Sequence, residues 1–418
     1  MAIFKINGGN TLRGQIKVSG MKNAAAPIFA ASLLTAEPVA LRNIPEISDL
    51  DKLAEIMRSM GIGVERQRDG EVVINAANIN PKTLDTKAVS TMRAAVLLIG
   101  PLLARCRELV IPEPGGCIIG RRPLHAHLAV VEQFGGTAKY ENGVYHFTLP
   151  AALKGVQVVL PEFSVTATEN ALMLASLAEG RSVIKLAAAE PHVVDLIHFL
   201  QKMGVKIFGE GTHTLIVEGA KKLYGVEHQI IPDQIEVGTF AVAAAATGGD
   251  VTISGIDLSH LDIILLKLTE AGVRFECDDQ HLRILPGGNL KNFTLQTFPY
   301  PGFPTDLQAP FGVLATQCRG TSLIKDPMFE GRLGYANELV KMGANAIIAD
   351  PHRVIITGPT PLYGTEINSL DLRAGATLVI AGLIAQGQTV LKNAEVLDRG
   401  YEKLLERLNS LGADIARD

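Results

Sequence analysis

Tryptophan is absent from this sequence of 418 residues, and cysteine is rare, with four copies. Cys106, Cys117, Cys277 and Cys318 lie far apart and form no CxxC pair. This spacing predicts neither a disulfide framework nor a zinc site, and it suits a protein of the reducing cytoplasm.

Long apolar runs and a strong net charge are also lacking. The longest apolar stretch, residues 374–385, is far shorter than the ~20 residues of a membrane helix. No apolar segment near the start has the pattern of a signal peptide. Lysine and arginine number 39 against 43 acidic residues, which gives a net charge of −4. We therefore expect a cytoplasmic protein that binds neither nucleic acid nor a membrane.

One pattern recurs six times: an apolar helix, a short strand, a second helix, and then a glycine followed by another strand. The closing glycines are spaced 68 to 74 residues apart, at Gly61, Gly135, Gly204, Gly272, Gly343 and Gly412. The helix expected over residues 401–411 has apolar residues every three to four positions, as an amphipathic helix does. A glycine after such a helix favours a left-handed turn that ends it. The sequence thus predicts six α/β units in two groups of three.

Capping-type residues stand where the first helix of each unit is expected to begin. We expect these N-caps at Asn23, Ser90 or Thr91, Ser164, Asp233, Thr305 and Ser369. Cations lie beside several of them, namely Lys22, Arg93 and Arg373. Helix N-termini attract anions, so such ends facing one cleft would form a positively charged pocket. Capping by solvated residues is the alternative interpretation.

The segment Pro114–Pro123 places Cys117 among three glycines and beside Arg121 and Arg122. Glycines favour a mobile loop, which could close over a ligand as a lid, and a guanidinium pair attracts anions and stabilises a thiolate. The loop therefore predicts thiol chemistry on an anionic substrate. A chance Gly-Gly-Cys turn is the alternative on these residues alone.

Seven segments in order make the chain similar to the enolpyruvyl transferases. They are Ser19–Ala24, Thr91–Ala94, Pro114–Pro123, Phe303–Gln308, Phe329–Arg332, Asp371–Ala374 and Asp398–Tyr401. The resemblance implies an α/β (α+β) fold of two inside-out α/β barrel domains, each of three repeats, with the active site in the cleft between them. It places the first domain, with the Cys117 lid loop, at residues 22–231 and the second at residues 1–21 and 232–418.

The resemblance also implies an activity. The expected reaction transfers the enolpyruvyl group of phosphoenolpyruvate to the 3′-hydroxyl of UDP-N-acetylglucosamine and releases phosphate, the first committed step of peptidoglycan precursor synthesis. It implies no cofactor and no metal, and inhibition by fosfomycin-type epoxides. The shikimate-pathway branch of the family lacks the glycine-rich cysteine loop. Two alternatives stay open: transfer to a different nucleotide sugar, and a non-catalytic regulator that binds a cell-wall precursor.

Residue roles follow from the same resemblance. Cys117 is expected to be the general acid that protonates phosphoenolpyruvate, and Asp306 the base near the sugar hydroxyl. The expected contacts of phosphoenolpyruvate are Lys22, Asn23, Arg122, Arg373 and Arg399, of which Lys22 and Arg399 are also expected to be catalytic. The expected contacts of the UDP-sugar are Asn23, Arg93, Arg122, Pro123, Leu124, His125, Ala126, Glu162, Phe163, Ser164, Val165, Glu190, Asp306 and Met328.

Three positions depart from the family pattern. His125 stands where an aspartate is usual, Glu162 replaces a lysine near Ser164, and Tyr300 replaces a histidine. An imidazole cannot accept hydrogen bonds as a carboxylate does, and a glutamate repels a diphosphate. We therefore expect weaker nucleotide binding than the family pattern implies, and tighter binding after either His125→Asp or Glu162→Lys.

Overall fold

The structure is a computed structural model that describes residues 2–116 and 123–418. The described chain divides into two compact units. The terminal unit comprises the stretch up to Ser19 together with Pro232–Asp418. The central unit comprises Gly20–Gly116 and the stretch from residue 123 to Ile231. Cys117 and Arg122 lie outside the described residues.

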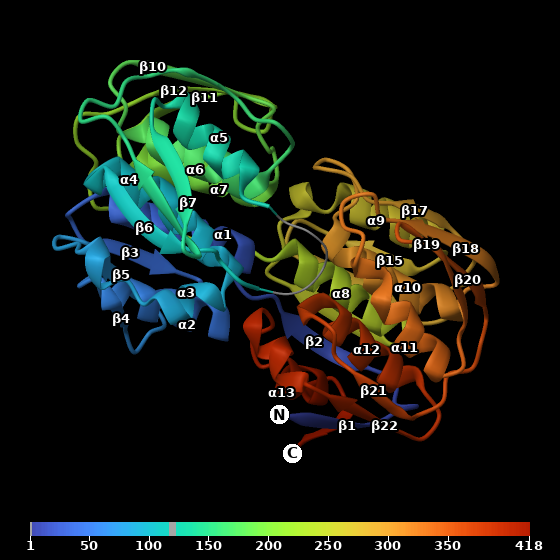
Figure 1. Ribbon diagram of the computed structural model, residues 1–418. Helices are drawn as coiled ribbons and strands as arrows, with labels where there is room; N and C mark the ends of the chain where they lie inside the picture. The colour runs from blue at the N-terminus through green and yellow to red at the C-terminus, as the bar shows by residue number, and fades with distance from the viewer. Residues whose placement is uncertain (1, 117–122) are drawn as a thin grey trace. The chain divides into compact units, whose positions relative to one another are not determined.

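The central unit is built from three consecutive α/β repeats (Figure 1). Its helices are α1 (Lys22–Ala31), α2 (Ser48–Ser59), α3 (Thr86–Ser90), α4 (Ile99–Cys106), α5 (His125–Gln133), α6 (Val165–Ser176) and α7 (Pro191–Lys202), with short 3₁₀ helices η1 (Ser32–Leu34), η2 (Pro81–Thr83) and η3 (Arg93–Leu98). Its strands are β3 (Val39–Arg42), β4 (Gly63–Arg66), β5 (Val72–Asn75), β6 (Glu108–Pro112), β7 (Thr137–Glu141), β8 (Val144–Thr148), β9 (Gln157–Val159), β10 (Arg181–Lys185), β11 (Lys206–Phe208), β12 (Thr214–Glu218) and β13 (Glu227–Gln229).

The terminal unit repeats this plan with the first and last parts of the chain. Its helices are α8 (Gln234–Ala246), α9 (Asp262–Glu270), α10 (Gln308–Gln317), α11 (Tyr335–Lys341), α12 (Leu372–Ile384) and α13 (Leu404–Ser410), with η4 (Leu258–His260), η5 (Thr305–Leu307), η6 (Arg332–Gly334) and η7 (Ala394–Arg399). Its strands are β1 (Ile3–Asn7), β2 (Arg13–Lys17), β14 (Asp250–Ser254), β15 (Arg274–Cys277), β16 (His281–Leu285), β17 (Thr294–Gln296), β18 (Gly320–Lys325), β19 (Asn345–Asp350), β20 (Arg353–Gly358), β21 (Glu366–Asn368), β22 (Gln388–Lys392) and β23 (Asp414–Arg417).

Each unit has three small sheets among its described residues. Those of the central unit run in the orders β13-β3-β5-β4, β6-β8-β7 and β11-β12-β10-β9. Those of the terminal unit run β15-β16-β14-β2, β17-β18-β20-β19 and β21-β22-β1-β23. In the four-stranded sheets, antiparallel pairs are completed by one parallel edge strand, such as β9 beside β10.

The sheets enclose the first helix of each repeat. In α12, 12 of the 13 residues are buried, and α8 is buried over all but its last two residues. Strands such as β12 instead alternate buried and exposed residues, so one sheet face contacts the helices and the other faces solvent. Helices inside and sheets outside confirm the predicted inside-out α/β architecture.

The chain passes between the units at two adjacent points. In the uninterrupted repeats, the strand before a buried helix pairs with the strand after it, as β17 does with β18. At the crossings these partners are exchanged: β2 pairs with β14, and β13 pairs with β3. The crossing segments run side by side, since Met21 N donates to Ile231 O at 2.8 Å and Asp233 N donates to Ser19 O at 3.0 Å. This exchange is why one unit contains both ends of the chain.

The six repeat glycines all adopt the left-handed conformation, with φ between 77° and 110°. Each follows the end of a helix, namely α2, α5, α7, α9, α11 or α13, and the next strand starts soon after. The predicted register of the repeat is therefore confirmed.

The predicted N-caps were right at two places and wrong at four. Ser164 caps α6 by accepting from Ala167 N, and Asp233 caps α8 by accepting from Ile235 N. The prediction was wrong at Asn23, Ser90 or Thr91, Thr305 and Ser369. Met21, Met92 and Pro304 precede α1, η3 and η5 without a side-chain cap, and Asp371 caps α12. Ser90 and Thr91 instead donate to backbone carbonyls of the preceding turn, whereas Thr305 donates to the distant Asp326. None of the described helices has the length and hydropathy needed to cross a membrane.

Candidate active site

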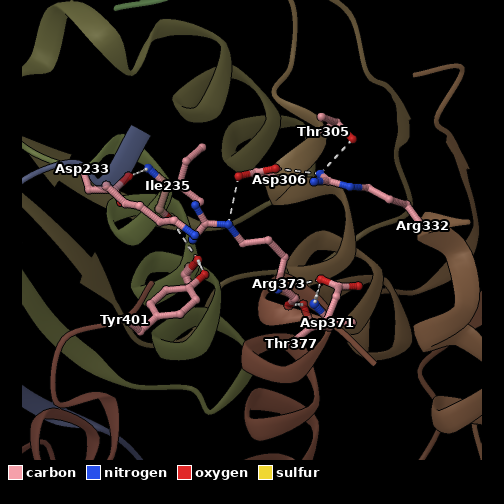
Figure 2. Close-up of polar contacts among 12 residues, drawn as sticks. Asp233, Ile235, Thr305, Asp306, Arg332, Asp371, Arg373, Thr377 and Tyr401 are labelled. Atoms are coloured by element: carbon pink, nitrogen blue, oxygen red, sulfur yellow. Dashed lines mark hydrogen bonds and ion pairs between the residues drawn. The ribbon is translucent and has the colours of Figure 1, made fainter. Parts of the chain in front are cut away.

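Three charged side chains meet in the terminal unit. Asp306 lies in η5, Arg332 begins η6, and Arg373 lies in the first turn of α12. Arg332 Nη1 donates to Asp306 Oδ1 at 2.6 Å, and Arg373 Nε donates to Asp306 Oδ2 at 2.9 Å (Figure 2). One carboxylate is thus held between two guanidinium groups. The structure brings together Asp306 and Arg373, two predicted site residues 67 positions apart.

The two guanidinium groups control the protonation of Asp306. Burial by itself would raise the pKa of Asp306, but the guanidinium groups of Arg332 and Arg373 outweigh it and hold that pKa well below its usual range. Arg373 is 6% exposed, and its guanidinium carbon lies 5.2 Å from the centre of the Tyr401 ring. Two guanidinium groups thus share one carboxylate in a mostly buried place, and the carboxyl of Asp233 also acts on Arg373.

Two donors of this cluster are buried and have no hydrogen-bond acceptor in the part of the chain that the structure describes. They are Arg332 Nε and Arg373 Nη1. A buried N–H group of a cation is costly to leave unpaired, and planar guanidinium groups match carboxylate and phosphate oxygens. The cluster therefore has guanidinium donors of the kind that bind an anion.

Asp326 is hydrogen-bonded to Thr305, the residue before Asp306. This buried carboxylate accepts from Thr297 Oγ1 at 2.9 Å, from Thr305 Oγ1 at 2.6 Å and from Met328 N at 2.9 Å. Arg332 Nη1 in turn donates to Thr305 Oγ1 at 3.1 Å. The predicted residue Met328 thus sits on the same network as Asp306.

Asp233, the N-cap of α8, is a second carboxyl near Arg373. It is 2% exposed and accepts from Ile235 N at 2.8 Å. Burial raises the pKa of Asp233 to about 6, although the Arg373 charge acts in the opposite direction. Arg399, another predicted residue of this unit, ends η7 just before Gly400 and Tyr401 and is half-buried.

In the central unit, the predicted anion-binding Lys22 forms an ion pair. Lys22 begins α1, and its Nζ lies 2.5 Å from Asp49 Oδ2 in α2, with 15% and 6% of the two side chains exposed. Asn23 follows in the same turn and is half-buried. The ammonium group of Lys22 is thus held at the start of α1 by a carboxylate of α2.

A buried histidine joins the start of α5 to α6. His127 lies 2.9 Å from Asn170 Nδ2 through Nδ1 and 3.2 Å from Thr166 Oγ1 through Nε2. Burial lowers the pKa of His127 to about 3, with smaller effects of Arg93 and His125. The ring is therefore neutral, and Nδ1 accepts from the amide while Nε2 donates to the hydroxyl.

Two of the three departures from the family pattern, His125 and Glu162, lie close together. His125 Nε2 lies 3.7 Å from Glu162 Oε2, and about half of each side chain is exposed (47% and 53%). Next to Glu162, the exposed Phe163 ring meets the His213 ring edge-on at 4.9 Å. The remaining predicted contacts of the central unit occupy the ends of these same elements: Arg93 at the start of η3, Pro123, Leu124 and Ala126 around the start of α5, Ser164 and Val165 at the start of α6, and Glu190 just before α7.

Sequence reasoning missed three participants. Arg332 lies in one of the segments that carry the family resemblance but received no role, and Asp326 and His127 were not singled out. A signal existed only for Arg332, as a second cation within a quoted motif. Among the described residues, no group of three or more His, Cys, Asp or Glu side chains is arranged to hold a metal ion.

Solved structures define the class of protein first. The enolpyruvyl transferase NikO from Streptomyces tendae superposes with a TM-score of 0.91 at 26% identity, covering 100% of this chain and 99% of that one. EPSP synthase from Acinetobacter baumannii has the same fold, with a TM-score of 0.76 at 20% identity and 100% coverage of both chains.

Sequence comparison then identifies the family. The chain belongs to the EPSP synthase (3-phosphoshikimate 1-carboxyvinyltransferase) family, which it matches over residues 6–408. It is 45% identical to the UDP-N-acetylglucosamine 1-carboxyvinyltransferase of Koribacter versatilis, with 99% of this chain and 96% of the relative covered. It is 44% identical to the enzyme of the same name from Magnetococcus marinus, with 99% and 98% covered.

Proposed function

We propose that this protein is a transferase that moves the enolpyruvyl group of phosphoenolpyruvate to the 3′-hydroxyl of UDP-N-acetylglucosamine, releasing phosphate. The observation that carries the proposal is the identity of 45% and 44% to two enzymes named for this reaction, across almost the whole of each chain. This reaction is the first committed step of peptidoglycan precursor synthesis, so its product is a precursor of the cell wall.

The chemistry is addition followed by elimination. A proton adds to the methylene carbon of phosphoenolpyruvate while the sugar oxygen bonds to the neighbouring carbon and loses its own proton. The tetrahedral adduct then loses phosphate and one methyl proton, which restores the double bond. The protein must supply a donor for carbon, a base for the hydroxyl, and cations for the carboxylate and phosphate.

The Asp306–Arg332–Arg373 cluster suits the anion and the base together. Arg332 Nε and Arg373 Nη1 are buried donors with no acceptor among the described residues, and a carboxylate or phosphate oxygen matches them chemically. We assign them, with Arg399, to binding phosphoenolpyruvate. Arg332 is an addition to the residues that the family resemblance implied.

Asp306 becomes a better base when an anion arrives. The two guanidinium partners hold the pKa of Asp306 well below its usual range. Its carboxylate is therefore a weak proton acceptor. An anion at about 5 Å adds roughly 3 kcal/mol of repulsion at an effective dielectric of 20. The anion also draws the guanidinium groups toward itself. Phosphoenolpyruvate thereby raises the proton affinity of Asp306 before the sugar hydroxyl reacts.

Residues between Lys22 and Glu190 in the sequence take the remaining roles. We assign Lys22 and Arg122 to the phosphate and Cys117 to protonation of the methylene carbon. A free thiol with an ordinary pKa near ~8.5 holds its proton at neutral pH, as a general acid must. Asn23, Arg93, the segment 122–126, the segment 162–165 and Glu190 are assigned to UDP-N-acetylglucosamine, with Asp306 and Met328 of the terminal unit.

The test is phosphate release from phosphoenolpyruvate across a panel of nucleotide sugars, with mass spectrometry of the products. UDP-N-acetylglucosamine should be the best acceptor and should gain one carboxyvinyl group. Better turnover of another nucleotide sugar would reassign the substrate. Absence of turnover with every acceptor, in a folded protein that still binds UDP-N-acetylglucosamine, would identify a non-catalytic binding protein.

A further inference from the structure

Asp326 is a buried carboxylate to which the proposed mechanism gives no role. It stands directly after β18, and Thr297 stands directly after β17, the parallel neighbour of β18. The ends of the two strands are in contact, since Thr297 Oγ1 donates to Asp326 Oδ1 at 2.9 Å. The backbone is held as well: Asp326 N donates to His352 O at 2.8 Å, and His352 Nδ1 donates to Asp326 O at 2.8 Å. This carboxylate is therefore fixed in place.

The second oxygen of Asp326 determines the direction of the Thr305 hydroxyl. Thr305 Oγ1 lies 2.6 Å from Asp326 Oδ2 and 3.1 Å from Arg332 Nη1. A hydroxyl has one proton, whereas a carboxylate only accepts hydrogen bonds and a guanidinium group only donates them. Thr305 must therefore donate its proton to Asp326 and present a lone pair to Arg332.

Thr305 and Asp306 together bind one nitrogen of Arg332 (Figure 2). Arg332 Nη1 carries two N–H groups, and it donates to Asp306 Oδ1 at 2.6 Å and to Thr305 Oγ1 at 3.1 Å. The guanidinium carbon lies 5.0 Å from the centre of the Phe329 ring. Nε of the same planar group is buried and has no acceptor among the described residues. The protein thus fixes one nitrogen of Arg332 and leaves a buried donor beside it for a ligand.

We propose that Asp326 is a positioning residue for phosphoenolpyruvate, which acts through the Thr305 hydroxyl to hold Arg332 in the orientation that receives an anion. Without this carboxylate the Thr305 proton has no fixed acceptor, so its lone pair no longer faces Arg332. Binding an anion must then also immobilise a long, flexible side chain, which weakens binding. The inference rests on the proposed function, because that proposal assigns Arg332 to phosphoenolpyruvate.

Thr305→Val and Thr305→Ser test the hydroxyl, because valine has the shape of threonine without this group and serine keeps it. The KM for phosphoenolpyruvate should rise about tenfold in Thr305→Val, which loses a hydrogen bond to a charged group, and stay within about threefold of wild type in Thr305→Ser. The KM for UDP-N-acetylglucosamine should change by less than about threefold in both variants, because the hydroxyl acts on Arg332.

Asp326→Asn tests the carboxylate without changing its size. The amide oxygen can still accept from Thr297 and from Met328 N, but an NH2 group now faces Thr305 and donates to its hydroxyl. The Thr305 proton is then no longer directed at residue 326. The KM for phosphoenolpyruvate should again rise about tenfold. A wild-type KM in folded Asp326→Asn would overturn the inference, and the Thr305 variants decide it if Asp326→Asn does not fold.

A double-mutant cycle separates positioning from a general loss of structure. In an Arg332→Gln background, adding Thr305→Val should change the KM for phosphoenolpyruvate by less than about twofold, because the residue through which Thr305 acts is already gone. Thr316→Val is a matched control. Thr316 is a buried threonine of α10 whose hydroxyl donates to Val313 O at 2.7 Å and accepts from Gln317 Nε2 at 2.9 Å. This variant should lose stability to a similar extent and keep the wild-type KM.

Two further kinetic results would overturn the inference while the proposed function stands. One is an unchanged KM for phosphoenolpyruvate in folded Thr305→Val, and the other is a tenfold effect of Thr305→Val that persists without Arg332. Calorimetric titration with phosphoenolpyruvate gives a readout that needs no turnover: Thr305→Val should bind it about tenfold more weakly than wild type, and equal affinities would overturn the inference. A wild type that binds phosphoenolpyruvate but turns over no nucleotide sugar would instead remove the proposed function, and this titration would decide the inference by itself.

Discussion

Replacing Asp233 by asparagine should stabilise the protein at neutral pH. The ordinary pKa of an aspartate is 3.8, and burial raises the pKa of Asp233 to about 6 in the folded state. The folded protein therefore holds this proton more tightly than the unfolded chain does, and ionisation costs stability. Since a pKa difference of one corresponds to ~1.4 kcal/mol, the full cost is about 3 kcal/mol. Asparagine keeps the side-chain oxygen that caps α8 but cannot ionise.

The upward shift of the Asp233 pKa determines the pH range in which stability is lost. Stability that is present below pH 4 should be lost by the wild type as pH rises through about 6, and Asp233→Asn should not lose it. The difference in unfolding free energy should thus grow by about 3 kcal/mol between about pH 4 and pH 7 and then stay level. Urea denaturation followed by far-UV circular dichroism measures it, which suits a chain without tryptophan.

Asp233→Ala separates ionisation from capping. It should show the same pH-dependent gain, shifted down at every pH by about 1 kcal/mol for the lost cap. A difference between wild type and Asp233→Asn that stays constant across this pH range would refute the reasoning, because it would mean that the buried carboxyl does not titrate there.

Four further outcomes are expected. Fosfomycin-type epoxides should alkylate Cys117, shown by peptide mapping, and Cys117→Ala should lose about 10²–10⁴ in rate by analogy with other general acids; a label on another cysteine would refute the assignment. Asp306→Asn should lower kcat by about 10²-fold or more and also destabilise the fold, because it leaves two guanidinium groups without their carboxylate; wild-type kcat would exclude the base role. His125→Asp alone should raise KM for UDP-N-acetylglucosamine by about threefold by setting a second carboxylate against Glu162, and adding Glu162→Lys should reverse this, as a double-mutant cycle would measure; additive effects would show that the two side chains do not interact. Gly412→Ala should destabilise the protein by about 1 kcal/mol in thermal or urea unfolding, from its φ of +96° and not from a steric clash, because a Cβ there would meet no heavy atom closer than 3.8 Å; an unchanged stability would contradict this.

The prediction for His125 and Glu162 changed once their contact was known. Taken one at a time, each substitution toward the family residue should tighten nucleotide binding. In the structure the two side chains lie 3.7 Å apart, so each single change alters the partner's surroundings as well. Only the double substitution restores an opposite-charge pair, and no spacing in the sequence reveals that the fold brings together two residues 37 positions apart.

The repeat architecture could be read from the sequence because its signals are local. A left-handed glycine after an apolar helix is a property of a few neighbouring residues, and Gly61, Gly204 and Gly412 behave alike wherever they stand in the fold. The caps at Ser164 and Asp233 are local in the same sense. The four wrong caps show the limit of such signals, since α1, η3 and η5 begin without a side-chain cap where tertiary packing holds them.

The sequence alone thus predicted the six repeats, the family and the residue types that the chemistry needs. These depend on periodicity and on short motifs, which are properties of residues close together in the chain. Tertiary structure decided the electrostatics. Asp306 and Asp233 are both aspartates at the starts of helical segments, yet their pKa values move in opposite directions. One carboxylate meets two guanidinium groups from distant segments, while the other is buried with less compensation. Proton affinity depends on the charges and the solvent that folding brings around a group, and that arrangement exists only once the repeats have packed.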